Sequence, residues 1–402
     1  MASKASLRGL DGLNFFMANV QTGFGPFVAV YLTTQAWTEV EIGFALSLGT
    51  LTTMLSQVPA GALVDATRHK RRAAALALLG IAASAVLLAA WPATLPVLLS
   101  EILHGVASCV LTPAIAAISL ALVGRQALGE RLGRNARFAS LGGAVAAGGM
   151  GLIGTYLSSA AVFWMTAALT VPSLISLAFI RERDMAAAIA AAQSSSGERS
   201  RIWPLLQQRG VFIFAACAML FTLSNAAMLP LAGSMATRHA GDEANLIIAA
   251  SIVVPQLVVA AISPWVGRVA ELRGRRIVLI IGFAMLPLRG LLLALVDQPA
   301  GLVFIQALDG ISAAALGVML PLIASDLTRG TNHFNLCMGI FGLAVGVGGT
   351  LSTTMAGLVA VWIGSGAAFA LLAVIGLLCT LLAWLAMPET REEIPAGAVA
   401  AG

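Results

Sequence analysis

Long apolar stretches separated by short polar segments make up almost the whole chain. Each stretch is about 20 residues or longer and lacks strict alternation of apolar and polar positions, which is typical of membrane-spanning helices rather than strands. Charged residues, Pro and Gly mark the breaks. The twelve candidate spans lie near 10–34, 41–64, 73–91, 95–123, 138–158, 160–180, 210–235, 245–266, 277–296, 300–325, 336–360 and 363–387. The pattern predicts an all-α membrane protein.

Composition supports the same interpretation. Of the 402 residues, 59% are hydrophobic and only 10% are charged, whereas a soluble domain carries about 25% charged residues. A net charge of +5 would suggest nucleic acid as a partner in a soluble protein. Here the charge falls in short loops, so we expect a lipid bilayer and no nucleic acid.

The basic residues predict the orientation of the chain. All of the 23 Lys and Arg residues except Arg238 and Arg289 fall in the two tails or in the loops on the same side as the tails. Cytoplasmic loops carry this excess. We therefore expect a multi-pass protein of the bacterial inner membrane with both termini in the cytoplasm.

One polar stretch, 181–209, is longer than the others and contains the run Gln193-Ser-Ser-Ser-Gly197. This composition favours a flexible linker. We expect an N-terminal six-helix bundle over 1–180, a C-terminal one over 210–387, and a cytoplasmic tail over 388–402.

The two predicted bundles resemble each other in sequence. The matched positions are Gly61 and Asp65 with Gly267 and Glu271, Glu101 and His104 with Gln306 and Asp309, and Gly148-Gly149 with Gly348-Gly349. Repeated bundles related by a pseudo-two-fold axis are typical of secondary transporters.

The segment Gly267-x-x-x-Glu271-x-x-Gly274-Arg275-Arg276 resembles the loop motif of the major facilitator superfamily, with Glu in place of the usual Asp. Gly61 and Asp65 form a second, partial copy. The resemblance covers essentially the whole chain. It implies two pseudo-symmetric six-helix bundles around a central cavity, lined mainly by the first, fourth, seventh and tenth helices and opened alternately to each side.

The resemblance also implies a conformational latch in the loop motifs. Asp65 and Glu271 would accept hydrogen bonds from helix N-termini or Arg groups; the alternative is a solvated loop charge that balances nearby Arg. The expected latch residues are Gly61, Asp65, Arg71, Gly267, Glu271, Gly274, Arg275 and Arg276.

Four ionisable residues fall inside predicted spans: Glu101, His104, Arg289 and Asp309. Such groups cost a few kcal/mol each in a bilayer and suggest function. We expect Glu101, His104 and Asp309 to couple proton movement to transport. The alternatives are a structural pair of Arg289 with Asp309, and a local hydrogen-bonded pair of Glu101 with His104.

Neutral polar residues in the spans are candidates for substrate contacts. We expect a substrate-binding set of Asn19, Gln21, Asn225, Gln256, Gln306 and Arg289. For Asn19 and Asn225, hydrogen bonding between helices is the alternative, worth only about 0.6 kcal/mol on average.

Motifs of enzymes are missing from the sequence. It contains no GxxxxGK[ST], HExxH, GxSxG or CxxC. Four cysteines, Cys109, Cys217, Cys337 and Cys379, lie inside apolar runs without paired spacing. We expect no enzyme, no catalytic residue, no metal site and no cofactor.

We therefore expect a monomeric secondary transporter that moves a small organic solute by alternating access. Because the expected cavity helices carry Glu101 and Asp309 but no Lys or Arg, we favour proton-coupled export of a neutral or cationic compound. The alternatives are an importer of a metabolite or siderophore-like metal chelate, with Arg289 as its anion contact, and a non-transporting membrane sensor.

Overall fold

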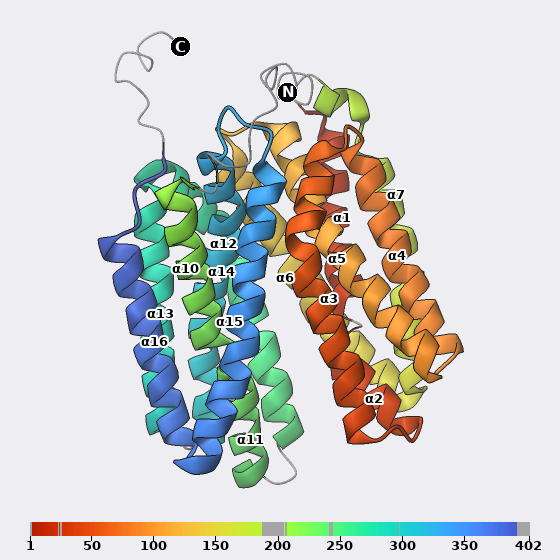
Figure 1. Ribbon diagram of the computed structural model, residues 1–402, viewed down its shortest axis with the longest axis vertical. Coiled ribbons are helices and arrows are strands. Elements are labelled where there is room, and N and C mark those ends of the chain that lie inside the picture. The colour runs from red at the N-terminus through yellow and green to blue at the C-terminus, as the bar shows by residue number, and fades with distance from the viewer. Residues whose placement is uncertain are drawn as a thin grey trace.

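The structure is a computed structural model that describes residues 2–22, 24, 26–186, 205, 207–240, 244–296 and 298–391. Within those ranges all long elements are helices (Figure 1). The first half contains α1 (Lys4–Thr22), α2 (Pro26–Thr34), α3 (Glu39–Ala66), α4 (Lys70–Ala90), α5 (Thr94–Val123), α6 (Leu128–Tyr156) and α7 (Ser159–Ala178). The second half contains α10 (Arg209–Asn225), α11 (Met228–Ala240), α12 (Ala244–Arg273), α13 (Arg275–Leu295), α14 (Pro299–Leu327), α15 (Phe334–Trp362) and α16 (Ser365–Leu385).

The predicted all-α fold is confirmed, and every predicted span corresponds to helix. The spans 10–34 and 210–235 are each divided in two, into α1 and α2 and into α10 and α11. By length and mean hydropathy, ten helical stretches of the described residues could cross a membrane. The predicted spans 10–34 and 41–64 are the two outside that set. The span 10–34 is interrupted between α1 and α2. The span 41–64 lies in α3, whose Ser and Thr residues lower its mean hydropathy.

The predicted start of the span 138–158 is wrong by ten residues, because α6 begins at Leu128. Leu128 and Leu132 are buried, so the first turns of this helix are amphipathic and continue the packing of the apolar span. Arg131, Arg134 and Arg137 therefore lie on a helix rather than in a loop.

The two halves lie side by side, and α1 begins and α16 ends at the same face of the molecule (Figure 1). We call this the termini face and the opposite one the far face. The halves contact each other mainly through two helix pairs, α3 with α15 and α6 with α12, and less extensively through α6 with α14 and α5 with α15. Both seams need glycine: a Cβ on Gly61 would collide with the carbonyl of Asn335, and one on Gly267 with the carbonyl of Gly129.

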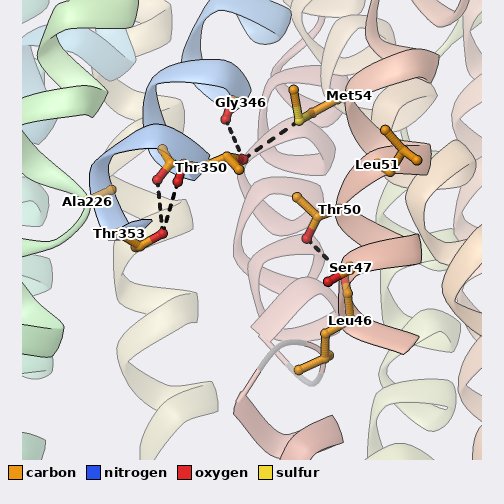
Figure 2. Close-up of a pocket in the computed structure, with 10 residues that line it drawn as sticks. Leu46, Ser47, Thr50, Leu51, Met54, Ala226, Gly346, Thr350 and Thr353 are labelled. Atoms are coloured by element: carbon orange, nitrogen blue, oxygen red, sulfur yellow. Dashed lines mark hydrogen bonds between the residues drawn. The ribbon is translucent and has the colours of Figure 1, made fainter. Parts of the chain in front are cut away.

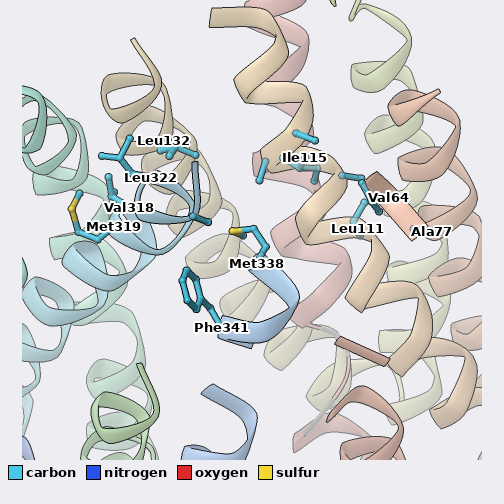
Figure 3. Packing of buried hydrophobic residues seen from close by; sticks show 14 of the residues in the cluster. Val64, Ala77, Leu111, Ile115, Leu132, Val318, Met319, Leu322, Met338 and Phe341 are labelled. Carbon is cyan, nitrogen blue, oxygen red and sulfur yellow. The ribbon is translucent and has the colours of Figure 1, made fainter. Parts of the chain in front are cut away.

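One hydrophobic cluster spans both halves (Figure 3). It includes Val64 and Leu111 of the first half and Val318 and Phe341 of the second, all buried. Two smaller clusters each lie within a single half, one around Met150 and one elsewhere around Phe369, Leu372 and Leu293. Many large apolar side chains remain exposed, such as Leu76 and Phe304, as expected for helices that face lipid tails.

The predicted linker 181–209 lies mostly outside the described residues, and so does most of the predicted tail 388–402. The start of the linker contacts the start of the chain. The Asp184 carboxylate accepts hydrogen bonds from the backbone N of Ser3 (3.0 Å) and from the hydroxyls of Ser3 (2.5 Å) and Ser6 (2.7 Å).

Candidate substrate cavity and its latches

A cavity of about 540 Å³ lies between the halves. Its wall is mostly apolar and comes from α1, α5, α6, α10, α12, α14 and α15, so the expected first, fourth, seventh and tenth spans all contribute and three further helices do as well. Its polar side chains are Asn14, Thr112, Asn135, Ser140, Gln256 and Asp309. Among the described lining residues, Asp309 is the one that can ionise.

Asp309 forms an ion pair with Arg289 of the neighbouring helix α13. The Arg289 Nη1 atom lies 2.7 Å from Asp309 Oδ1. The side chain of Asp309 is 18% exposed, whereas that of Arg289 is 1% exposed. The guanidinium therefore lies behind the carboxylate, and Arg289 does not belong to the cavity lining.

Two amide oxygens complete the surroundings of Arg289. Nη2 donates to Oε1 of Gln306 (2.5 Å) and Nη1 donates also to Oδ1 of Asn225. The structure thus brings four of the predicted site residues, Asn225, Arg289, Gln306 and Asp309, into one cluster. Asn225 and Gln306 orient the arginine, because their oxygens are already occupied, while Oδ2 of Asp309 has no hydrogen-bond partner in the described part of the chain.

The other predicted substrate residues fall in different places. Gln256 lines the cavity, and its side-chain amide contacts no hydrogen-bonding group of the described residues. Asn19 is buried and donates to the carbonyl of Phe15 on its own helix (2.8 Å). Gln21 lies near the end of α1 and does not belong to the cavity lining. Gln256 is therefore the predicted polar residue that is best placed to meet a solute.

Glu101 and His104 lie on the same helix, α5, but pack against different elements. Glu101 is 6% exposed, its carboxyl group abuts Gly49 of α3, and its Oε1 atom has no hydrogen-bond partner among described groups. The His104 ring stacks on Phe24 with ring centroids 3.7 Å apart, and its Nε2 lies 3.2 Å from the hydroxyl of Ser108. The structure records no contact that makes these two residues a hydrogen-bonded pair.

At the termini face, Asp65 joins the halves. Its carboxylate accepts from the backbone N and Nδ2 of Asn335 (3.0 and 2.7 Å) and from the backbone N of Leu336 (2.8 Å). These residues begin α15, so the acid lies at the positive end of that helix, where negative charge is favoured. This geometry is the arrangement that the loop motif implied.

The second seam repeats the arrangement. Oε1 of Glu271 on α12 accepts from the backbone N of Glu130 near the start of α6 (3.1 Å), and Arg268 forms an ion pair with Glu130 (3.1 Å). Gly133 packs against the carbonyl of Ser263 so closely that a Cβ would collide with it.

The basic residues of the expected latch bind within their own halves. Arg71 lies 3.8 Å from Glu182. Arg275 forms an ion pair with Asp326 (3.0 Å), and Arg276 donates to the carbonyl of Trp384. Gly274 has a φ of +104° and precedes α13, whose first backbone N–H groups donate to Glu389.

Sequence reasoning missed the ion pairs of Asp11, which is buried. This α1 residue accepts from Arg131 (2.6 Å) and from Arg134 (2.7 Å) of α6, and Arg131 also donates to Asn135 (2.7 Å). An aspartate inside an apolar run was a signal that could have pointed to a partner. The partners were hidden because they were placed in a loop.

A second cavity, of about 700 Å³, lies between α3 and α15 on the far-face side of the Asp65 contacts. Figure 2 shows Ser47, Thr50 and Met54 of α3 facing Thr350 and Thr353 of α15. The Thr350 hydroxyl lies 3.7 Å from Sδ of Met54. The described lining carries hydroxyl, thioether and alkyl groups and no charged residue.

Comparison with known proteins identifies the family. The family profile described as Major Facilitator Superfamily matches residues 10–254 and 211–401. The chain belongs to the major facilitator superfamily. Two Mycobacterium tuberculosis proteins, from strains H37Rv and CDC 1551, are 36% identical over 392 residues, covering 96% of this chain and 94% of each relative; both are called uncharacterized MFS-type transporters.

Solved structures show the same fold. A human organic anion transporter (TM-score 0.72, 15% identity, covering 94% of this chain and 99% of that one) is similar. A proton:xylose symporter is also similar, with a TM-score of 0.73 and 14% identity, covering 96% of this chain and 96% of that one. The Escherichia coli fucose:proton symporter has a TM-score of 0.73 and 15% identity, covering 98% of this chain and 100% of that one. This member of the superfamily is thus a multi-pass secondary transporter and not an enzyme.

Proposed function

We propose that the protein exports a neutral or cationic organic solute across the bacterial inner membrane in exchange for protons. The termini face is then cytoplasmic, in agreement with the distribution of Lys and Arg. In this proposal, the hydrogen bonds of Asp65 and Glu271 across the seams keep that face closed, and the uncharged cavity between α3 and α15 serves as the outward path. We also propose that the protein acts as a monomer and that its two bundles are joined by a cytoplasmic linker over 181–209.

The observation that carries the proposal is the asymmetry of Asp309. One carboxylate oxygen is held by a buried arginine, the other has no hydrogen-bond partner among the described residues, and the side chain lines a largely apolar cavity. A solute and a proton would compete for Oδ2. Arg289 would stay in place when Asp309 is protonated, because the oxygens of Asn225 and Gln306 continue to accept from it. The amide of Gln256 would hydrogen-bond a polar group of the solute.

Glu101 would couple the proton from outside the cavity. Its carboxyl is packed between α5 and α3, and an ionised carboxylate with an unpaired oxygen is strongly disfavoured there. We propose that Glu101 carries a proton while α3 and α5 are packed as seen, and loses it when α3 moves. His104 would follow the position of α1 through Phe24.

The test is transport in proteoliposomes. A panel of neutral, cationic and anionic solutes is supplied under an imposed pH gradient. Transport is measured for the wild type and for Asp309→Asn, Glu101→Gln and Gln256→Ala. Gln126→Ala, which changes an exposed residue of the turn before α6, is the control. We expect gradient-driven flux of neutral or cationic solutes that the first two variants lose. We expect Gln256→Ala to raise KM, since it removes one hydrogen bond to the solute.

Other outcomes would replace the proposal. Flux restricted to anions or metal chelates, and lost in Arg289→Ala, would indicate the importer. Flux in the wild type that ignores the gradient would exclude proton coupling. No flux of any solute in a folded wild type would favour a sensor.

A further inference from the structure

A third pocket, of about 360 Å³, opens at the termini face between α1 and the start of α6. We call it the basic pocket. Its ionisable lining residues are Lys4, Arg8, Asp11, Glu130, Arg131 and Arg134. It shares no described lining residue with the central cavity. The basic pocket is therefore separate from the proposed transport site.

The sequence builds this pocket from two helical faces. Lys4, Arg8 and Asp11 are four and three residues apart and so lie on one face of α1. Arg131 and Arg134 are three residues apart on the first turns of α6, which packs on α1. Four cationic side chains thus converge on one cavity with two acidic ones.

Both acidic side chains already have cationic partners. Asp11 binds Arg131 and accepts three hydrogen bonds from Arg134, and Glu130 forms its ion pair with Arg268 across the seam. Among the described residues, Lys4 and Arg8 have no carboxylate partner. The pocket therefore carries an uncompensated positive charge.

The available donors match a phosphate group. Arg134 uses Nε and Nη2 for Asp11, which leaves Nη1, and Arg8 and Lys4 add further charged donors. Guanidinium groups bind phosphate oxygens in pairs, and the ammonium of lysine serves as a point charge. Ala127, which precedes α6, also lines the pocket, but the backbone N–H of Glu130 there already donates to Glu271, so the donors for a phosphate are the side chains of Lys4, Arg8 and Arg134.

We propose that the basic pocket binds a phosphate-type anion at the termini face. The phosphate is supplied either by the headgroup of an anionic phospholipid or by a free phosphate. Lys4 and Arg8 would hold it from α1, and Arg134 from α6.

The test uses the full-length protein in lipid nanodiscs, with two arms. In the first arm the bilayer is phosphatidylcholine alone, and inorganic phosphate is titrated while thermal unfolding is measured. In the second arm the bilayer also contains phosphatidylglycerol, and native mass spectrometry counts the lipid molecules that remain bound. The variants are Lys4→Gln with Arg8→Gln, and the charge-preserving Lys4→Arg.

Arg68→Gln with Arg72→Gln is the matched control. It removes two exposed basic residues from the termini face of the same half, outside the pocket. We expect the pocket double variant to bind about 30-fold more weakly, since each basic side chain contributes about fivefold to binding of an anionic headgroup. Lys4→Arg and the control pair should bind like the wild type.

The two arms separate the sources. Loss in the first arm alone supports free phosphate, and loss in the second alone supports the lipid headgroup. The proposal is overturned if the pocket double variant binds phosphate and phosphatidylglycerol as tightly as the wild type. It is also overturned if the control pair loses as much affinity.

Discussion

Arg289 and Asp309 lie on adjacent helices, with Nη1 of the arginine 2.7 Å from Oδ1 of the aspartate, but they differ in their access to the cavity. The arginine is 1% exposed and the aspartate 18% exposed. The buried charge binds one oxygen of the carboxylate, and the other oxygen has no hydrogen-bond partner among the described residues. The ion pair with Arg289 therefore does not conflict with the solute and proton binding that we propose for Asp309.

Removing Asp309 should destabilise the protein more than removing Arg289. Asp309→Ala leaves the guanidinium buried without its counter-charge, which costs about 3–5 kcal/mol, whereas Arg289→Met leaves a carboxylate that water in the cavity can reach. In the Asp309→Ala background, Arg289→Met should recover part of the loss. Denaturation of the two single variants and the double variant gives the coupling free energy between the two residues. If the losses in the free energy of unfolding simply add, the prediction is contradicted.

Opening of the termini face can be followed at Cys337, which is buried in α15 next to the residues that bind Asp65. Asp65→Asn weakens charged hydrogen bonds worth about 1.5–3 kcal/mol. We expect thiol alkylation of Cys337 to become roughly tenfold faster or more. The variant is made in a chain in which the other three cysteines, Cys109, Cys217 and Cys379, are serine.

Glu39→Gln is the control for that experiment, because it removes an acid from the opposite end of the same helix. It should leave the alkylation rate at Cys337 unchanged. Equal rates in wild type and Asp65→Asn would mean that Asp65 does not hold the halves together.

Glycine substitutions should have opposite signs in the seams and on the surface. A Cβ at Gly61 or Gly267 collides with a backbone carbonyl of the other half, so Gly61→Ala and Gly267→Ala should each destabilise the closed arrangement by about 1–3 kcal/mol. Gly43 on α3 has nothing within 4 Å of its would-be Cβ, and Gly43→Ala should stabilise by up to about 1 kcal/mol through helix propensity. Thermal unfolding of the three variants checks the order; a uniform loss would contradict it.

The contact between the N-terminus and the start of the linker should persist in acid. Hydrogen bonds from Ser3 and Ser6 lower the pKa of Asp184 to about 2. Because the pKa of Asp184 is lower in the folded protein, the contact stabilises the folded state fully above the ordinary Asp pKa of about 3.9. This stabilisation is lost as the pH falls through about 2.

Asp184→Asn should therefore flatten the pH dependence of the unfolding temperature between about pH 4 and pH 2. Glu182→Gln, which removes a neighbouring acid with a 3.8 Å partner, serves as control and should leave the slope as in the wild type. An unchanged slope in Asp184→Asn would show that another group titrates in this window.

Several features could be predicted from local sequence. The apolar stretches specify helices wherever lipid replaces water, because backbone groups must then be satisfied within one segment. The repeated positions of Asp65 and Glu271 specified the family, and both carboxylates accept from the start of a helix in the other half. Asp309, which lines the central cavity, was a candidate from the sequence because an ionisable group in an apolar run is costly.

The tertiary structure decided which of the polar residues meet. Asn225 and Gln306 were expected to contact solute, yet they bind Arg289, and Glu101 faces Gly49 rather than His104 or the cavity. A position on a helix gives the face of a side chain but not the helix that it meets.

The sequence by itself determined the helices, the two halves and the superfamily, because hydrophobic length and short motifs are local properties of the chain. Only the tertiary structure decided the partners of Asp11, the place of Arg289 behind Asp309, and the grouping of Lys4 and Arg8 with Arg134 in one pocket. Those relationships depend on how helices distant in sequence pack against one another. That packing is set by the sum of burial, charge and hydrogen-bonding interactions over all the helices, which no single segment of the sequence contains.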